Sequence, residues 1–382
     1  MSSAFASLWA EIAPIGLTDN GYLRFALTEP ERVLRDWFRN QADRRDMTVT
    51  EDGNGNLFAW RGEPWADGVV LTGSHFDSVP HGGGYDGPLG IVSAFLAVDR
   101  LPAGRNVAVA AFCEEEGGRF GVPCLGSRLL TGAIDPSHAA RLCDRDGVSF
   151  EEALGYRPAG PRRLRFKAAV ELHIEQGRAL DVPVGVASAI WPHGRWRFDF
   201  RGDADHAGTT RMADRRDPML TYAYMVLAAN KEARLAGAHA TIGRVAVEPN
   251  ATNAIPSLVR GWLDARAADE STLETLVEAI VKRATDRAGR DGIAVSVEPE
   301  SVTAEVAFDT ALASRVSELL GDAPILPTGA GHDAGVLSAH VPTAMLFVRN
   351  PTGVSHSPAE HATDDDCEAG VEALATVLLE LT

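Results

Sequence analysis

The stretch VVLTGSHFD, residues 69–77, decides the fold. Its first half is an apolar run typical of a buried β-strand, and it ends in the polar pair His75 and Asp77. Two more apolar runs also end in polar residues, at 106–112 and 168–172. Buried strands of this kind predict an open α/β sheet, in which active sites lie beyond the carboxyl ends of the strands. We therefore expect the residues that follow these strands to carry the chemistry.

The flanking sequence extends this pattern in both directions. A helix is expected after Thr28, because Thr28 and Glu31 have the spacing of a capping box. Residues 52–55 (DGNG) are typical of a hairpin turn. Further expected elements are a helix at 88–101, a strand at 343–348 and a last helix after Thr363. The α/β pattern is thus found in both the first and the last part of the chain.

The middle of the chain has a different pattern. From about residue 191 the strands alternate between apolar and polar residues, as half-exposed strands do. The expected order is a strand at 195–202, a helix at 214–235, strands at 240–248 and 257–266, a helix capped by Ser271 and Glu274, and a strand at 292–298. This β-α-β-β-α-β order is that of a ferredoxin-like unit. We predict a catalytic domain made of residues 1–190 and 300–382, interrupted by an inserted domain at 191–299.

Composition narrows the function classes. The chain has 382 residues, 45% of them apolar, which is enough for a large core without disulfide bonds. Its net charge of −17 disfavours binding to nucleic acid or to an anionic membrane. The first 16 residues lack the pattern of a signal peptide, and no apolar run approaches the roughly 18 residues of a membrane span. The four scattered cysteines form no C-x-x-C pair and predict reduced thiols in a cytoplasmic protein.

Several possible metal ligands follow the predicted strands. His75 and Asp77 lie two residues apart, so they point to the same face of a strand. Asp86 lies in a glycine-rich turn, where it could bridge two cations or, taken alone, cap the next helix. The run 114–116 (EEE) is either an acidic turn in solvent or a cluster that cations neutralise. Taken alone, His173 could be a core histidine, but three strands that all end in His, Asp or Glu favour a metal centre.

A last imidazole comes from the loop that contains His356, with a carboxylate four residues later. The combined set has imidazole and carboxylate donors and no thiolate, which suits Zn²⁺, Mn²⁺, Co²⁺ or Ni²⁺. Two such ions about 3.5–4 Å apart, bridged by Asp86, would activate a shared water and polarise a carbonyl group. We expect two divalent metal ions per subunit.

Together these motifs resemble a known family. The matching segments are 73–90, 114–120, 171–177, 203–212, 253–256, 329–334 and 355–360. They are similar to the hydantoinase/carbamoylase family of the aminoacylase-type metallohydrolases, whose members include N-carbamoyl-L-amino-acid hydrolases, allantoate amidohydrolases and ureidopropionases. The resemblance implies a di-metal, aminopeptidase-like catalytic domain whose inserted ferredoxin-like domain acts as a lid and forms a homodimer contact.

The resemblance also implies a role for each matching residue. The implied metal ligands are His75, Asp86 as the bridge, Glu116, His173 and His356. Glu115 would be the general base, Asp77 would orient His75, and Glu114 would lie outside the pattern. His206 would stabilise the developing oxyanion, usually in the partner subunit's site. The implied substrate-binding residues are Gln176, His206, Asn253, Arg266 and Gly331, with Arg266 facing a carboxylate. Arg211 departs from the pattern, since it follows the Thr-Thr pair where Pro is common.

The resemblance predicts a hydrolase that cleaves the ureido C–N bond of a small N-carbamoyl amino acid or a related ureido acid, releasing ammonia and carbon dioxide. Allantoate or ureidoglycolate is an alternative substrate within the same family. Other readings are an aminoacylase or dipeptidase on the same scaffold, and a metal-binding protein without activity. An intact ligand set together with Glu115 argues against the inactive reading.

Overall fold

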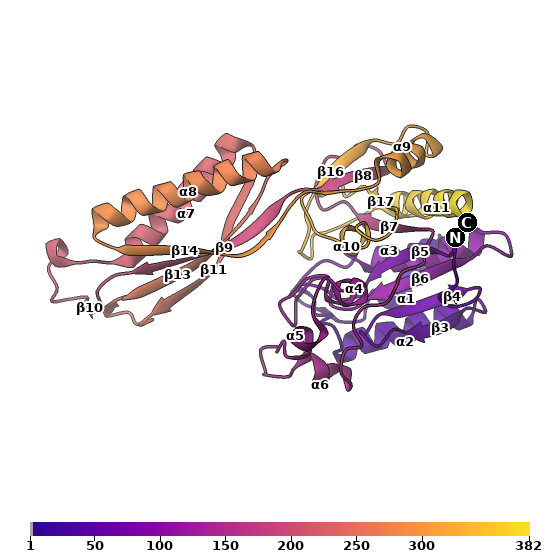
Figure 1. Ribbon diagram of the computed structural model, residues 1–382, viewed down its shortest axis with the longest axis horizontal. Helices are drawn as coiled ribbons and strands as arrows, with labels where there is room; N and C mark the ends of the chain where they lie inside the picture. Colours follow the sequence, from indigo (N-terminus) through magenta and orange to yellow (C-terminus); the bar gives the residue numbers. More distant parts are fainter. Residues whose placement is uncertain (1–2) are drawn as a thin grey trace. The chain divides into compact units, whose positions relative to one another are not determined.

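The computed structural model describes residues 3–382 and divides the chain into two compact units (Figure 1). The first unit comprises the chain up to Ile190 together with Ala307–Thr382, and the second comprises Trp191–Val306. The boundary predicted at residue 299 falls inside strand β14 (Ala294–Thr303), which continues past it. The second unit therefore ends seven residues later than the sequence pattern suggested.

A nine-stranded mixed sheet forms the centre of the first unit. Its order is β15-β8-β17-β7-β5-β6-β4-β3, with β16 beside β8. The four consecutive strands β17, β7, β5 and β6 run parallel to one another. The strands are β3 (Thr48–Glu51), β4 (Leu57–Arg61), β5 (Val70–His75), β6 (Val107–Phe112), β7 (Ala168–Ile174), β8 (Val184–Ile190), β15 (Val306–Ala307), β16 (Ile325–Thr328) and β17 (Thr343–Val348). A small hairpin, β1 (Leu17–Thr18) and β2 (Gly21–Tyr22), lies outside this sheet. The predicted α/β fold is confirmed.

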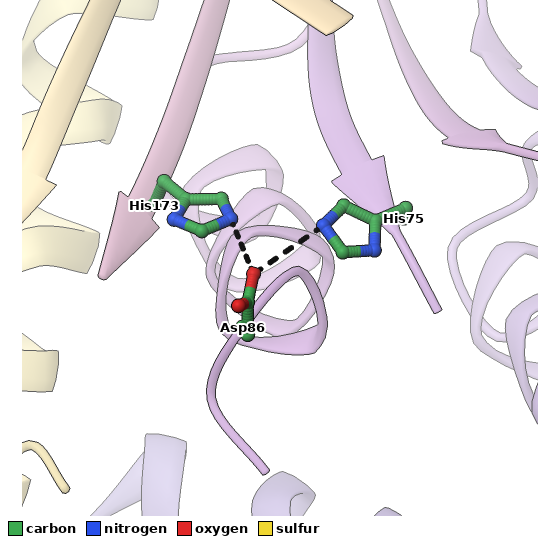
Figure 2. Close-up of side chains that lie close together, drawn as sticks. All are labelled: His75, Asp86 and His173. Atoms are coloured by element: carbon green, nitrogen blue, oxygen red, sulfur yellow. Dashed lines mark ion pairs between the residues drawn. The ribbon is translucent and has the colours of Figure 1, made fainter. Parts of the chain in front are cut away.

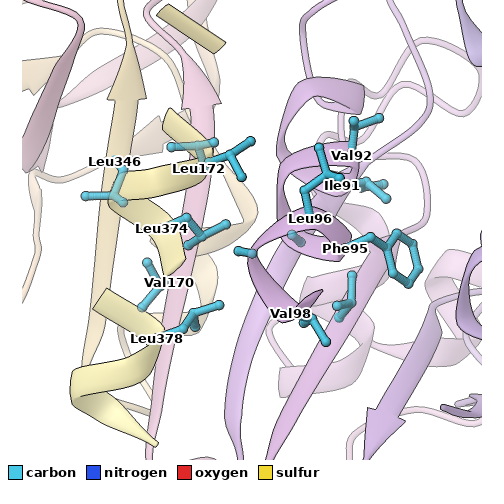
Figure 3. Packing of buried hydrophobic residues seen from close by; sticks show 14 of the residues in the cluster. Ile91, Val92, Phe95, Leu96, Val98, Val170, Leu172, Leu346, Leu374 and Leu378 are labelled. Carbon is cyan, nitrogen blue, oxygen red and sulfur yellow. The ribbon is translucent and has the colours of Figure 1, made fainter. Parts of the chain in front are cut away.

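Helices cover both faces of this sheet. The helices of this unit are α1 (Ala4–Ile12), α2 (Glu29–Asp43), α3 (Pro88–Arg100), α4 (Leu125–Thr131), α5 (Pro136–Ala140), α6 (Phe150–Leu154), α9 (Thr310–Leu319), α10 (Asp333–Leu337) and α11 (Asp364–Leu381). Figure 3 shows α3 and α11 packed against β7 and β17 through buried side chains such as Val170, Leu172 and Leu374. Each such side chain contributes about 1.5–3 kcal/mol when it is fully buried. The alternate side chains of the strands, such as Ala169, pack on the opposite face with Leu337.

The second unit is a four-stranded antiparallel sheet with two helices on one face (Figure 1). Its elements are β9 (His193–Arg201), α7 (Pro218–Ala236), β11 (His239–Glu248), β13 (Leu258–Arg266), α8 (Glu270–Asp291) and β14, together with the short pair β10 (Asp205–His206) and β12 (Ala254–Ile255). The main sheet has the order β11-β13-β9-β14, and its core includes Phe198, Leu263 and Ile280. The predicted β-α-β-β-α-β order is present, while its action as a lid stays a prediction.

The starts of both helices in this unit differ from the sequence interpretation. Helix α7 begins at Pro218 rather than near residue 214, because Met212–Asp214 form a separate 3-10 turn and Asp217 caps the helix. Helix α8 is capped by Asp269 rather than by Ser271, since the Asp269 carboxylate accepts a hydrogen bond from the Thr272 backbone N–H at 2.8 Å. Two acidic N-caps were therefore overlooked.

Within residues 3–382, no helix combines the length and the apolar character that crossing a membrane requires.

Candidate active site

Two neighbouring parallel strands carry the histidines at the centre of the site. Gly73 of β5 pairs with Glu171 of β7, so His75 and His173, each two residues later, lie at the same level of the sheet. Their rings are 5.8 Å apart between centroids, and both face Asp86, which lies in the loop before α3 (Figure 2). Oδ1 of Asp86 lies 3.6 Å from Nε2 of His75 and 3.1 Å from Nε2 of His173. The parallel pairing therefore brings together three residues that are distant in sequence.

Backbone carbonyl groups set the orientation of both imidazole rings. Nδ1 of His75 donates to the carbonyl oxygen of Asp77 at 3.0 Å, and Nδ1 of His173 donates to that of Ile174 at 2.9 Å. Each Nε2 therefore points at Asp86. Both Nε2 atoms are buried, and neither has a hydrogen-bond partner among residues 3–382. Histidines that bind metal are held in this way, so the pair fits a divalent cation.

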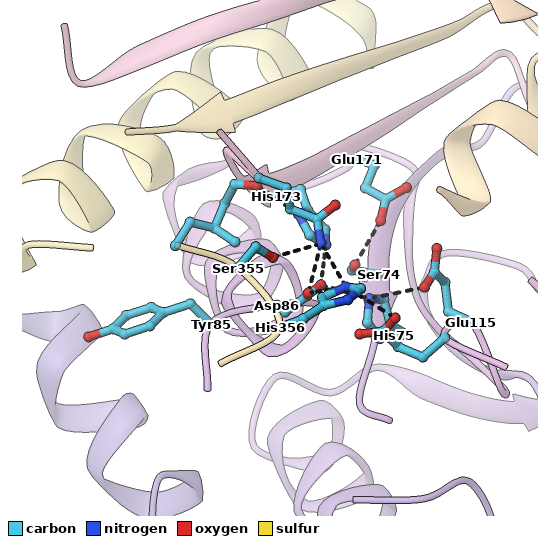
Figure 4. A network of polar contacts seen from close by, with 12 residues as sticks. Ser74, His75, Tyr85, Asp86, Glu115, Glu171, His173, Ser355 and His356 are labelled. Atoms are coloured by element: carbon cyan, nitrogen blue, oxygen red, sulfur yellow. Dashed lines mark hydrogen bonds and ion pairs between the residues drawn. The ribbon is translucent and has the colours of Figure 1, made fainter. Parts of the chain in front are cut away.

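The second oxygen of Asp86 faces another pair of donors. Oδ2 of Asp86 lies 3.3 Å from Nε2 of His356 (Figure 4). The same Nε2 lies 3.5 Å from Oε2 of Glu116. Two triads result, His75–Asp86–His173 and Asp86–Glu116–His356, each with ligand atoms within 4.8 Å of one another. Since Asp86 belongs to both triads, the donor set fits two cations bridged by one carboxylate. The structure thus brings all five predicted ligands together, and metal binding itself stays a prediction.

The electrostatics of the cluster call for added positive charge. Burial raises the pKa of the Glu115 carboxyl well above its usual range, and burial with repulsion from Asp86 raises the pKa of Glu116 to about 8. Asp86 behaves in the opposite way: burial disfavours its charged form, but the surrounding imidazoles, His173 above all, hold its pKa well below the usual range. Burial also opposes the charged form of His356, yet the carboxylates beside it raise its pKa to about 9. Protons on the imidazoles supply charge that divalent ions would otherwise supply.

Asp77 holds the segment that carries Glu115 and Glu116. Its carboxylate accepts the backbone N–H of Glu115 at 3.1 Å and that of Glu116 at 3.0 Å. The carboxylate lies 3.6 Å from Nδ1 of His75, whose direct hydrogen bond goes to the Asp77 carbonyl oxygen instead. The contact by which Asp77 can orient His75 is therefore made mainly by the backbone carbonyl oxygen of Asp77, and not by its side chain. The side chain joins the ends of β5 and β6.

The three consecutive glutamates point to different places. Oε2 of Glu115 lies 3.7 Å from Nε2 of His75, at the edge of the cluster. Glu116 faces His356, as described above. Glu114 has a left-handed backbone (φ 55°), and its carboxylate accepts the backbone N–H groups of Arg119 and Phe120. This geometry agrees with the register in which Glu114 lies outside the ligand pattern.

Sequence reasoning missed the role of Glu360. Its buried carboxylate accepts the backbone N–H groups of Tyr85 at 3.0 Å and Asp86 at 2.9 Å through one oxygen. The other oxygen lies 3.3 Å from the hydroxyl of Ser355, which donates to it. A Cβ at Gly83 would lie only 2.3 Å from the same carboxylate, so this glycine is required for the close approach. Glu360 therefore positions the backbone of the shared ligand, and the only sequence signal was its spacing from His356.

Glu171 is a second carboxylate whose role was not recognised from the sequence. Glu171 accepts a hydrogen bond from the Ser74 hydroxyl at 2.7 Å and from the Ala334 backbone N–H at 2.9 Å (Figure 4). It thereby joins β5, β7 and the start of α10. The loop before α10 contains Gly331 and places the buried His332 ring 4.5 Å from that of His173. His332 therefore packs against one of the proposed metal ligands.

Among the predicted substrate-binding residues, Gln176 lies within the cluster. Its Nε2 donates to Oδ2 of Asp86 at 2.8 Å and to the Ser355 hydroxyl at 3.1 Å. Its Oε1 is buried and has no hydrogen-bond partner in the part of the chain that the structure describes. Gln176 therefore presents an unsatisfied acceptor beside the ligands, as a substrate-binding amide would.

The second unit carries His206, Asn253 and Arg266. The pairing of β10 with β12 brings His206 beside Ala254, and the Ala207 N–H donates to the Asn253 carbonyl oxygen at 3.0 Å. Arg266 ends β13, and its guanidinium makes two hydrogen bonds to Asp264. His206 and Asn253 thus share one loop pair, while Arg266 lies at the end of the main sheet.

The loop fixes the tautomer of His206. Its Nδ1 accepts the backbone N–H groups of Gly208 at 2.9 Å and Thr209 at 3.2 Å. An Nδ1 that accepts cannot carry the proton of a neutral imidazole, so the proton lies on Nε2. His206 therefore presents an N–H donor, the group that an oxyanion requires. Arg211, the departure noted in the sequence, is exposed and forms an ion pair with Asp214 at 2.6 Å.

Comparison with known proteins identifies the family of the chain. The model of the peptidase family M20/M25/M40 matches residues 71–380. An N-carbamoyl-L-amino acid amidohydrolase of Geobacillus stearothermophilus is 35% identical, with 98% of each chain covered. A solved amidase of the hydantoinase/carbamoylase family from Burkholderia vietnamiensis is 32% identical, with a TM-score of 0.89 over 100% of this chain and 97% of that one.

The chain belongs to the hydantoinase/carbamoylase family. An allantoate amidohydrolase of Escherichia coli K12 is a further relative of this family member, 31% identical over 97% of this chain and 95% of its own. The predicted family is confirmed, and with it a hydrolase that acts on C–N bonds other than peptide bonds.

Proposed function

We propose that this family member hydrolyses the carbamoyl C–N bond of a small N-carbamoyl-L-amino acid or related ureido acid, using two divalent metal ions. The observation that carries the proposal is the cluster centred on Asp86, whose two oxygens face separate donor pairs with Glu115 at its edge. The names of the relatives support a ureido substrate, and the imidazole and carboxylate donors suit Zn²⁺, Mn²⁺, Co²⁺ or Ni²⁺.

Glu115 acts as the general base. When bound, the two ions polarise the ureido carbonyl group and make a water molecule more acidic. Glu115 takes a proton from this water while the water oxygen attacks the ureido carbon. The carboxyl group of Glu115 then gives a proton to the departing nitrogen. Ammonia leaves, and the carbamate that remains decomposes to an amine and carbon dioxide. Asp77 holds Glu115 and Glu116 in place through their backbone N–H groups.

We assign recognition of the substrate mainly to the second unit. Backbone N–H groups donate to Nδ1 of His206, so its Nε2–H is available to donate a hydrogen bond to an oxyanion. Arg266 offers a planar guanidinium to the substrate carboxylate, a geometry that Lys cannot provide. Asn253, with Gln176 and Gly331 of the first unit, would bind the remaining polar groups. Closure of the second unit as a lid would exclude water from the site.

The second unit also supports a proposed homodimer. Leu220, Leu227 and Leu235 are more than half exposed and recur along α7 at helical spacing. Strand β11 forms an edge of the sheet and exposes Val245. An exposed apolar stripe beside an unpaired strand edge is typical of a protein interface. The free cysteines are consistent with the proposed cytoplasmic location.

The test is ammonia release by the metal-reconstituted protein. The panel contains N-carbamoyl-L-amino acids, N-carbamoyl-β-alanine, allantoate and ureidoglycolate, with an N-acetyl amino acid as the control. We expect turnover of at least one ureido compound and none of the control. Release of acetate from the control, with no ammonia from the ureido set, would assign the chain to the aminoacylases and overturn the proposal.

A further inference from the structure

We propose that Cys124 is a positioning residue for Glu115: its thiol donates a hydrogen bond to one carboxylate oxygen and so directs the other oxygen toward the metal cluster. This inference rests on the proposed function, in which Glu115 is the general base. Cys124 lies outside every segment of the sequence that resembles the family.

The contact is specific to one carboxylate oxygen. Sγ of Cys124 lies 3.5 Å from Oε1 of Glu115, within the range of a hydrogen bond from sulfur. Oε2, the other oxygen, lies 3.7 Å from Nε2 of His75. Cys124 and Glu115 are only 4% and 5% exposed, so water does not compete for the contact. The two carboxylate oxygens of Glu115 therefore face different groups: Oε1 faces the Cys124 thiol, and Oε2 faces His75 of the proposed metal site.

The backbone holds the two residues side by side. The N–H of Cys124 donates to the carbonyl oxygen of Glu115 at 2.7 Å, and the N–H of Leu125 donates to that of Glu114 at 3.0 Å. A third bond, from Gly126 to Cys113 at 2.9 Å, continues the series. These bonds fix the thiol relative to the strand exit that carries the base.

The backbone conformation at position 124 is unusual for a cysteine. Its φ of 54° is left-handed, a region in which glycine and asparagine are favoured and other residues are disfavoured. Local backbone preference therefore does not explain the side chain, and strained residues of this kind are concentrated at functional sites. A thiol at this position supplies a donor that glycine lacks.

The thiol stays protonated and can therefore donate. Burial, with the neighbouring Glu115 and Asp333 carboxylates, raises the pKa of Cys124 well above its usual range. Without this donor the Glu115 carboxylate would be free to rotate, because its terminal torsion has a broad minimum. A less ordered base lowers the rate of proton transfer while leaving substrate and metal binding intact.

The kinetic experiment compares Cys124→Ala, Cys124→Ser and Cys113→Ala with the wild type. A neutral hydrogen bond contributes enough to predict a fall in kcat of about 2- to 10-fold for Cys124→Ala. We expect KM and the metal content per subunit to stay unchanged, and Cys124→Ser to recover most of kcat because its hydroxyl also donates. Cys113→Ala is the matched control, because this buried thiol lies close to Gly55 rather than at the base.

Wild-type kcat in Cys124→Ala would overturn the inference, and so would a serine variant as slow as the alanine variant. A fall in metal content or a rise in KM would point to a structural role and would overturn it as well. Absence of ammonia release by the wild type on every ureido compound would instead overturn the proposed function.

A spectroscopic measurement tests the hydrogen bond without turnover. The S–H stretching band of Cys124 is isolated as the infrared difference between the wild type and Cys124→Ala. We expect this band to lie at a lower frequency than that of a free thiol and to shift when Glu115→Gln removes the carboxylate charge. An unchanged band in Glu115→Gln would overturn the inference whatever the kinetics show.

Discussion

Replacement of Glu360 by alanine should weaken metal binding although Glu360 is not among the proposed ligands. The buried carboxylate accepts two backbone N–H groups, one of which belongs to Asp86, so the variant leaves two donors without their partner. Hydrogen bonds to charged groups contribute about 1.5–3 kcal/mol each. Of these two hydrogen bonds, only the one to the Asp86 N–H orients a proposed metal ligand. Removing a residue that orients a metal ligand typically lowers metal affinity about 10–100-fold. We expect a loss of this size, about 1.4–2.7 kcal/mol.

The assay is competitive titration of Zn²⁺ against a chromophoric chelator, with Glu360→Gln as the matched control. Burial and the nearby Asp86 raise the pKa of Glu360 to about 7, so the titration is done at about pH 8, where the wild-type carboxyl is ionised. The glutamine oxygen can still accept both N–H groups, and this variant should lose less affinity than the alanine variant. Wild-type affinity in Glu360→Ala, or equal losses in both variants, would refute the reasoning.

Three further outcomes are expected. Glu115→Gln should keep its metal but lose about 10²–10⁴-fold in kcat, measured by metal analysis and ammonia release; an active, metal-loaded variant would contradict the assignment of the base. In the metal-free protein the pKa of Glu116 is raised to about 8, so its contribution to stability is complete below about pH 4 and is lost as the pH rises through 8. The metal-free Tm should therefore fall between about pH 5 and 8, and a Tm that rises over this window would speak against the buried cluster. Leu227→Glu should give monomers by light scattering with little change in Tm, because this side chain is 71% exposed, whereas Leu17→Glu, exposed but outside α7, should stay dimeric.

The sequence predicted that the proposed ligands lie together, and it could do so because the sheet itself aligns them. Parallel strands end at the same edge, so an imidazole near the end of each of two strands implies that His75 and His173 lie close together. The apolar runs also gave the strands accurately: the one expected at residues 343–348 is β17. Buried strands are identifiable from composition alone because both of their faces are apolar.

The supporting contacts could not be predicted in the same way. Glu360 holds the backbone of Asp86 across 274 residues of sequence, and nothing in the local pattern near either residue reveals this contact. The same holds for Glu171, which looks like an ordinary strand residue but accepts the N–H of Ala334. Helix starts were misplaced where several acidic or hydroxyl residues compete for the cap, as at Asp269 and Ser271.

The two units have separate hydrophobic cores, and this separation has an evolutionary consequence. The proposed metal ligands lie on the first unit, while His206, Asn253 and Arg266 depend on a core formed by residues such as Phe198. Mutations that reshape substrate recognition can therefore accumulate in one unit without loosening the packing beneath the other. Such a division makes the substrate range easy to change under selection while the hydrolytic chemistry is inherited intact. Relatives named after N-carbamoyl amino acids and after allantoate both span nearly the whole of this chain.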